Sequence, residues 1–244
     1  MSIHLDIHKN LDKFRLDIHL HTDEKRLCLF GPSGAGKTTT LNCIAGLETP
    51  DEGYIRVNDI LYFHSEEKRN IPAAKRKVGY MFQDYALFPH LTVYQNVVFG
   101  LRRLPHKEQR ERGMHFLEVT RLTSLANQYP SKLSGGQKQR VALARSLILQ
   151  PDVLLMDEPF SALDYHLKQE LKNELLSILA NYKGQTVFVT HDLEEAYELC
   201  NSIAVYSNGH IAALDKRENL FSQPPCHSVG IAPAYENLRN ILLH

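Results

Sequence analysis

The residues from Gly31 to Thr38 have the types and spacing of a phosphate-binding loop. They read Gly-Pro-Ser-Gly-Ala-Gly-Lys-Thr and match the pattern G-x-x-x-x-G-K-[ST] at every position. Glycines let the backbone curl so that successive N–H groups point at phosphate oxygens, and a following helix adds its own unpaired N–H groups. Lys37 can place its charge on the outer phosphates, and the Thr38 hydroxyl can ligate Mg²⁺. The pattern predicts a nucleoside triphosphate site; the alternative is an ordinary glycine turn before a helix.

A second helix start of this kind follows in the sequence Leu133-Ser134-Gly135-Gly136-Gln137. Ser134 is a good N-cap, and the paired glycines leave the first N–H groups of the helix uncovered. A serine and two glycines before a helix form a common cap, whereas the five-residue string is far less common. The segment is therefore a candidate second anion-binding helix start.

Two acidic residues, Asp157 and Glu158, end the apolar run Val153 to Met156, which predicts a buried strand. Ligands bind at the carboxyl ends of parallel strands, so both carboxylates are expected on the side of the phosphate loop. Asp157 suits a Mg²⁺ contact, and Glu158 suits the orientation or deprotonation of an attacking water. The alternative is that the two acids only cap a strand.

A histidine, His191, follows another apolar run, Thr186 to Thr190. The position at the end of a predicted strand favours a hydrogen bond from His191 to a terminal phosphate. The other interpretation is that His191 caps the next helix.

The composition is that of one large α/β domain, or of one domain with a small appendage. The chain has 244 residues, 43% of them hydrophobic, with 28 basic and 28 acidic residues. The zero formal charge gives no indication of a nucleic-acid-binding protein. No apolar run reaches the length of a membrane span, and the start lacks the layout of a signal peptide. The four cysteines form no close pair, which favours free thiols in a reducing compartment.

The N-terminal residues 3 to 20 alternate between apolar and polar side chains and predict two half-buried, antiparallel strands. Their polar face includes four histidines, His4, His8, His19 and His21. We interpret these as a solvated surface rather than a metal site, because no other ligand-rich segment accompanies them.

Several further segments are assigned by pattern. Residues 64 to 77 are polar and basic, typical of a surface loop, and residues 107 to 127 are predicted to be helical. The long helix after Asp164 is expected to carry an apolar stripe of Leu167, Leu171, Leu175 and Ile178. The apolar segment 84–101 is either core or a docking surface for another protein.

The chain resembles the ATP-binding subunits of ABC transporters. The resemblance rests on the order of four features: the phosphate loop, the Leu-Ser-Gly-Gly-Gln helix start, Asp157-Glu158 and His191. The likeness covers about residues 1–221, leaving 222–244 as a tail. It implies the α/β fold of P-loop ABC ATPases, with a mostly parallel core sheet, an antiparallel β-subdomain and a helical subdomain near residues 84–150. The loop would hold ATP and Mg²⁺ through Gly31, Pro32, Ser33, Gly34, Ala35, Gly36, Lys37, Thr38 and Thr39.

The resemblance also implies roles for residues outside the loop. Gln83 would sense Mg²⁺ and the attacking water, Asp157 would support Mg²⁺, Glu158 would be the general base and His191 the switch. The signature segment would be Ser134, Gly135, Gly136 and Gln137, and Asp164 would lie in the loop that links two subunits.

The partners that the resemblance implies are a second copy of the chain and a membrane permease. The signature of one subunit would close on the nucleotide of the other, giving a head-to-tail homodimer bound peripherally at the cytoplasmic face of the membrane. An extracytoplasmic solute-binding protein would act indirectly. The segment Lys75 to His90 looks like that of importers for inorganic oxyanions, polyamines and sugars, most similar to molybdate importers, with sulfate and tungstate close behind. The alternatives are a soluble ABC ATPase acting on nucleic acid or ribosomes, and a nucleotide-binding regulator without turnover.

Two departures from the family pattern stand out. The usual aromatic residue that stacks on adenine upstream of the loop is replaced by Leu11 or Phe14, which would supply weaker apolar contact. Residues 228–244 resemble only the beginning of the C-terminal regulatory β-barrel domain of many such importers, so regulation through that domain is expected to be absent or truncated.

Overall fold

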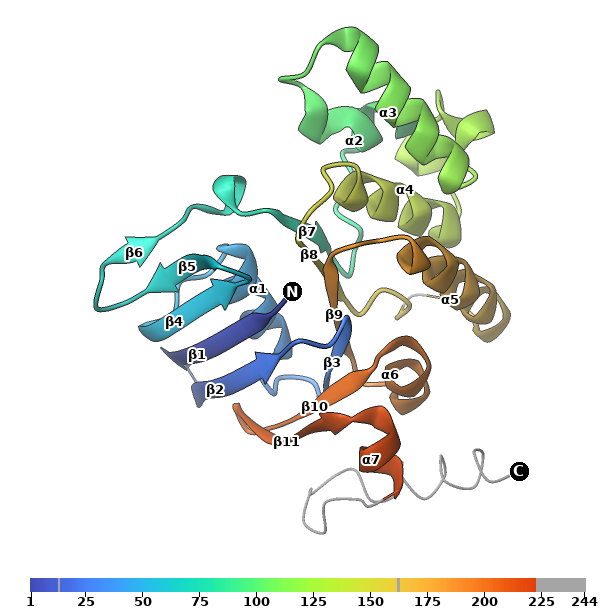
Figure 1. The fold of residues 1–244 in the computed structure, drawn as a ribbon. Helices are drawn as coiled ribbons and strands as arrows, with labels where there is room; N and C mark the ends of the chain where they lie inside the picture. The colour runs from blue at the N-terminus through green and yellow to red at the C-terminus, as the bar shows by residue number, and fades with distance from the viewer. Residues whose placement is uncertain (13, 162, 223–244) are drawn as a thin grey trace. The chain divides into compact units, whose positions relative to one another are not determined.

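A computed structural model describes residues 1–12, 14–161 and 163–222 (Figure 1). The chain divides into two compact units. Unit 1 comprises Met1–Val78 and the chain from Gln185 onward, and unit 2 comprises Gly79–Gly184. The predicted tail, apart from Ser222, lies outside the described residues, and the predicted limits of the helical subdomain stay a prediction.

Unit 1 is built on a mixed sheet, which confirms the α/β class. Its strands are β1 (Ile3–Asn10), β2 (Arg15–Thr22), β3 (Arg26–Phe30), β4 (Glu52–Val57), β5 (Ile60–His64), β6 (Arg69–Asn70), β9 (Gln185–Thr190), β10 (Ser202–Ser207) and β11 (His210–Lys216). They follow the order β6-β5-β4-β1-β2-β11-β10-β3-β9. β3 pairs in parallel with β10 and β9, whereas β1 pairs antiparallel with β2 and β4. The sheet therefore has an antiparallel part and a parallel part.

The β1–β2 hairpin confirms the alternation predicted for residues 3–20. Ile3, Leu5 and Ile7 of β1 are at most 3% exposed, and Leu16 and Ile18 of β2 are fully buried. The polar residues between them form the other face (Figure 1, blue strands). Burial of one apolar face fixes the register, because a slip of one residue would expose every apolar side chain.

The helices of unit 1 are α1 (Lys37–Ala45), α6 (Leu193–Leu199) and α7 (Arg217–Ser222), with a 3₁₀ turn at Ala73–Lys75. α1 ends at Gly46, which has a φ of 78° and adopts the left-handed conformation that favours glycine. The prediction of a simple surface loop over residues 64–77 was wrong in one respect. Arg76 is only 6% exposed, and its guanidinium donates to the Cys43 and Ile44 carbonyls over 2.7 and 2.8 Å. Both carbonyls belong to the last turn of α1. The Gly46 N–H also donates to the Cys43 carbonyl over 3.2 Å, and the guanidinium adds a charged donor to each carbonyl.

Unit 2 contains two strands and most of the helices. The strands are β7 (Val78–Met81) and β8 (Val153–Asp157), and the helices are α2 (Val93–Val97), α3 (His106–Val119), α4 (Gly135–Leu147) and α5 (Tyr165–Ala180). Short 3₁₀ helices occupy Val98–Leu101, Thr123–Leu125 and Pro130–Lys132. α3 ends at Val119, so the predicted continuation of this helix to residue 127 was wrong. No helix in the described part of the chain combines the length and apolar character needed to cross a bilayer.

The segment 84–101 is partly core and partly surface. Val93, Val97 and Leu101 belong to a buried cluster shared with α3 and α4, whereas Leu87 and Phe88 remain partly exposed. On α5, the buried stripe includes Leu171, Leu175 and Leu179. Leu167 and Ile178 of the predicted stripe are partly buried, and the 3.6-residue period also places Leu179 on the inner face.

Candidate functional site

The phosphate loop of unit 1 has the curled backbone that its glycines predict. Gly34 and Gly36 have φ angles of 79° and 99°, a region that residues with a Cβ rarely adopt. A Cβ on Gly36 would also lie 2.4 Å from Leu16 Cδ1, so only glycine fits there. Pro32 and Ser33 are exposed, which leaves the outside of the loop accessible to a ligand.

Lys37 lies inside this loop rather than in solvent. Its side chain is 4% exposed, and Nζ donates to the Gly31 and Pro32 carbonyls over 2.8 and 2.7 Å. The ammonium group is therefore held at the first turn of α1, close to the exposed Thr38 hydroxyl and to Thr39. A cation held beside the positive end of a helix is an arrangement suited to a phosphate ligand.

The start of α1 is tied to the sheet through Thr40. The Thr40 hydroxyl donates to the Gly36 carbonyl over 3.0 Å and accepts from the Tyr206 hydroxyl over 3.2 Å. Burial raises the pKa of Tyr206, so its hydroxyl stays a donor. The link makes the loop a rigid extension of β10.

His191 lies at the same sheet edge as the phosphate loop. β3 and β9 run parallel with Phe30 opposite Thr190, so Gly31 and His191 leave neighbouring strands at the same level. The interpretation of His191 as a helix cap was wrong. The N-cap of α6 is Asp192, whose carboxylate accepts from the N–H groups of Glu194 and Glu195.

The upstream aromatic residue Phe14 lies beside the loop. Its ring is close enough that a Cβ on Gly36 would lie 3.7 Å from Phe14 Cε2, and a Cβ on Gly209 only 2.6 Å from Cδ2. Phe14 is half-buried. The ring therefore borders the start of α1. The weaker contact expected from the sequence is the one between Phe14 and adenine.

Unit 2 brings Gln83 and Glu158 together, although they lie 75 positions apart. Gln83 Nε2 is 3.5 Å from both Glu158 Oε2 and Ser161 Oγ, at the long limit of a hydrogen bond. Ser161 was not among the predicted site residues. Its hydroxyl donates to the Glu158 carbonyl over 3.1 Å, which ties the turn after β8 together.

Glu158 has a strained backbone, with a φ of 44°. Such a conformation costs about 1–3 kcal/mol in a residue other than glycine and is concentrated at functional sites. The preceding Asp157 is the last residue of β8 and is 6% exposed. The turn therefore keeps one carboxylate inside and directs the next toward Gln83.

The signature segment of unit 2 begins a helix as predicted. Ser134 Oγ accepts from the Gln137 N–H over 3.3 Å, and Gln137 Oε1 accepts from the Ser134 N–H over 3.0 Å. This reciprocal pair is a capping box. A Cβ on Gly136 would lie 3.1 Å from Leu171 Cδ1, so this glycine allows α4 and α5 to approach closely.

Asp164 caps α5 within the same unit. Its carboxylate accepts from the Leu167 N–H over 3.0 Å. A Cβ on Gly135 would lie 3.2 Å from Leu163 Cδ2, so the signature turn is a neighbour of the Leu163–Asp164 segment. The two predicted subunit-contact elements therefore share one surface of unit 2.

A further residue of unit 2 that the sequence did not reveal is Arg145. Tyr85 and Ala86, which follow Gln83 closely, have φ angles of 63° and 42°. The Arg145 guanidinium donates to their carbonyls over 2.7 and 2.6 Å. Desolvation lowers the pKa of Arg145, and the two carbonyls satisfy its buried donors. The only sequence signal was a basic residue on the buried side of the predicted helix.

Comparison with known proteins identifies relatives of most of the chain. The sequence profile described as ABC transporter matches residues 15–161. The sulfate/thiosulfate import ATP-binding protein CysA of Synechocystis sp. is 46% identical over 211 residues, which are 85% of this chain and 58% of the relative. The protein of that name numbered 1 in Shewanella oneidensis is 44% identical over 92% of this chain and 61% of its own length. The chain thus spans little more than half the length of these relatives.

Solved structures agree with the sequence relatives. A dimeric ATP-binding cassette in a post-hydrolysis state bound to ADP and Pi is 30% identical, with a TM-score of 0.73 over 89% of this chain and 99% of that one. A dimeric structure of a cassette described as that of a bacterial ABC transporter has a TM-score of 0.74 at 29% identity. The profile match covers more than half of the chain, and the chain therefore belongs to the ABC transporter family, as one of its ATP-binding domains.

Proposed function

We propose that the chain is the ATP-hydrolysing subunit of an ABC import complex. The observation that carries the proposal is the curled phosphate loop that holds the Lys37 amine, in a chain whose relatives are named import ATP-binding proteins. A similar cassette described as bound to ADP and Pi supports the choice of nucleotide.

In this proposal, unit 1 binds the triphosphate. Lys37 leaves its two carbonyl acceptors for the outer phosphates, and the loop N–H groups enclose them. Thr38 ligates Mg²⁺, and His191 donates to the terminal phosphate from the adjacent strand end. Phe14, which borders the start of α1, contacts the adenine base.

Unit 2 supplies the groups that act on the attacking water. Glu158 is the general base, and Gln83 orients the same water and Mg²⁺. Asp157 supports Mg²⁺ from the end of β8. The 3.5 Å separation of Gln83 and Glu158 is short enough for both to contact one water. A bound Mg²⁺ would shield the phosphate charge, and Thr38, Gln83 and Asp157 offer oxygen ligands of the kind that would hold it.

A homodimer completes each ATP site. The chain has one phosphate loop and one signature turn, and both similar cassettes are described as dimeric. A head-to-tail pair would place Ser134, Gly135 and Gly136 of each copy on the nucleotide of the other. Asp164 lies next to the signature turn and would take part in the same contact.

The complex imports an inorganic oxyanion. The sequence pattern favoured molybdate, but the relatives reported above are named for sulfate and thiosulfate and give molybdate no support. Sulfate or thiosulfate is therefore the preferred solute. A permease in the membrane carries it, and a solute-binding protein outside delivers it. The chain itself docks peripherally at the cytoplasmic face, with Leu87 and Phe88 as contact residues.

The experiment that tests catalysis is the isosteric substitution Glu158→Gln. It removes the general base and leaves the charge of the phosphate loop unchanged. We expect the rate of ATP hydrolysis to fall by about 100-fold or more, while ATP binding is retained and a dimer accumulates in ATP. Phosphate release measures the rate, and sedimentation measures the dimer.

The matched control is Glu118→Gln on α3, since Glu118 is exposed and belongs to no predicted site. Parent-like hydrolysis by the Glu158→Gln protein would show that Glu158 is not the base. Loss of ATP binding in that variant would mean that Glu158 has a structural role instead.

A further inference from the structure

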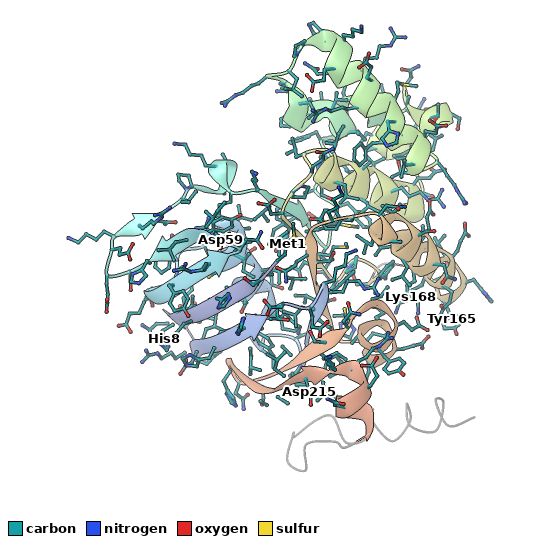
Figure 2. The ribbon with its side chains drawn as sticks, viewed as in Figure 1. Met1, His8, Asp59, Tyr165, Lys168 and Asp215 are labelled. Carbon is teal, nitrogen blue, oxygen red and sulfur yellow. The ribbon has the colours of Figure 1, made fainter. Side chains whose placement is uncertain are left out.

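The polar face of the β1–β2 hairpin carries a square of two histidines and two aspartates. In the antiparallel register, Asp6 lies opposite His19 and His8 lies opposite Asp17. Residues two apart on a strand point to the same side, so all four side chains share one face. Figure 2 shows His8 toward the hairpin end of β1, away from Met1.

Three of these side chains converge on one point. Asp6, His8 and His19 each offer one possible metal-ligand atom, and these three atoms lie within 4.8 Å of one another. Asp6 Oδ1 is 3.1 Å from His19 Nδ1 and 3.7 Å from His8 Nε2. Zinc bonds of about 2.0–2.1 Å in a tetrahedron separate neighbouring ligand atoms by about 3.3 Å. The two measured distances lie on either side of that value.

Asp17 occupies the position of the carboxylate that orients metal-binding histidines. Its Oδ1 is 3.0 Å from His8 Nδ1 and 3.0 Å from His19 Nε2, the ring nitrogens that do not face Asp6. Histidines that bind metals usually donate their other N–H to such a group, which fixes the tautomer. Each imidazole thus lies between two carboxylates. Asp6 is placed to share a metal ion with it, and Asp17 is placed to orient its ring.

The His8–Asp17 contact is at ion-pair distance but makes no hydrogen bond. His8 Nδ1 and Asp17 Oδ1 are both buried, and neither has a hydrogen-bond partner among the described residues, despite their 3.0 Å separation. Buried polar atoms without partners are costly and call for an explanation. A cation bound at His8 Nε2 would keep the imidazole proton on Nδ1, and a small rotation of the ring would then turn that N–H toward Asp17 Oδ1.

We propose that Asp6, His8 and His19 bind a divalent transition-metal ion of the zinc class, with Asp17 as the orienting residue. Two imidazoles favour zinc-like ions over Mg²⁺ or Ca²⁺, and two carboxylates balance the double charge. His19 and Asp6 remain partly exposed, with side-chain exposures of 66% and 41%, so a water can complete the coordination. The site lies on paired strands backed by buried Leu16 and Ile18, which hold its geometry.

A neighbouring group offers an internal control. His4, His21 and Asp23 also bring donors within 4.8 Å, but the two imidazoles stack with their centroids 3.9 Å apart. Among the described residues, no carboxylate bridges both of these rings as Asp17 does. The substitution pair His4→Gln and His21→Gln therefore removes the same number of histidines from the same strands without touching the proposed site.

The test measures Zn²⁺ binding to the full, nucleotide-free chain without a histidine tag. Calorimetry with ZnCl₂ gives the stoichiometry and the dissociation constant, and the visible spectrum of added Co²⁺ reports tetrahedral coordination. We expect about one Zn²⁺ per chain at this site. The pair His8→Gln and His19→Gln should raise the dissociation constant by more than about 100-fold, and Asp17→Asn by about 10–100-fold. The control pair should leave it unchanged.

Three results would overturn the proposal: no stoichiometric binding, binding unaffected by the His8 and His19 substitutions, or binding lost in the control pair. Circular dichroism and ATP affinity establish that each variant is folded. If the double variant does not fold, Asp6→Asn removes one ligand by an isosteric change. Parent-like Zn²⁺ affinity in that variant would equally contradict the site.

Discussion

The Lys37 amine is held by two backbone carbonyls of its own loop. Both acceptors are neutral, whereas a phosphate is charged, so the exchange of partners favours the nucleotide. The same contacts hold the loop in its curled form before a ligand arrives. A preorganised loop loses less conformational freedom on binding, which leaves more of the interaction free energy for affinity.

The substitution Lys37→Ala should weaken ATP binding itself. A hydrogen bond to a charged group contributes about 1.5–3 kcal/mol, so we expect the dissociation constant of ATP to rise by about 10–100-fold. Calorimetry with ATP and Mg²⁺ measures this change. Lys107→Ala on α3 is the control, since Lys107 is exposed and lies in unit 2. Unchanged affinity in the Lys37 variant would show that the charge of Lys37 does not contribute to ATP binding.

The C-terminus of α1 depends on a side chain from a distant loop. The Arg76 guanidinium also donates to the Ile71 carbonyl and to Asn70, and it lies over the Tyr62 ring with its central carbon 5.2 Å from the centroid. Burial lowers the pKa of Arg76. Arg76 thus links α1 to the segment that leads into β7.

The substitution Arg76→Met should destabilise the protein through this helix. It leaves the carbonyls of Cys43 and Ile44 without their charged donor, at a cost of about 2–3 kcal/mol. For a chain of this size, that cost lowers the melting temperature by about 4–10 °C. Differential scanning calorimetry measures the change. Arg69→Met is the control, because Arg69 is exposed on β6. An equal fall in melting temperature for both variants would show that loss of a positive charge, not loss of the helix contacts, causes the change.

At the level of the whole molecule, the proposed function requires a surface that can contact a membrane partner. Leu87 and Phe88 are partly exposed next to the buried cluster of α2. The Phe88 N–H donates to Asn96 Oδ1 over 2.9 Å, and the Asn96 amide returns a hydrogen bond to the Phe88 carbonyl over 3.1 Å. A fully buried Asn96 therefore presents this apolar segment in one conformation.

Charges on that segment should abolish assembly with the permease. We expect the pair Leu87→Glu and Phe88→Glu to prevent co-purification of the membrane subunits, because a carboxylate loses hydration in an apolar interface. ATP binding should be retained. Met114→Glu is the control, since Met114 is 40% exposed on α3. A complex that forms normally with the double variant would place the permease contact elsewhere.

Much of the architecture could be predicted, because local rules govern it. The alternation of residues 3 to 20 predicted β1 and β2, and Ser134 marked the start of α4 correctly. The length of α3 was overestimated, because polar residues beyond Val119 are compatible with both helix and turn.

Sequence alone determined the phosphate loop and the signature turn, since each depends on glycines and caps within one short segment. Tertiary structure decided which distant residues meet. The proximity of Gln83, Glu158 and Ser161 depends on chain folding over 75 positions, and the left-handed backbone of Glu158 has no local signal. The histidines of β1 and β2 were interpreted as a solvated surface because no other ligand-rich segment accompanies them. The proposed metal site instead takes its ligands from both strands of the hairpin. Only the register of the hairpin sets Asp6 against His19 and Asp17 against His8, and that register is fixed by the apolar side chains on the opposite face.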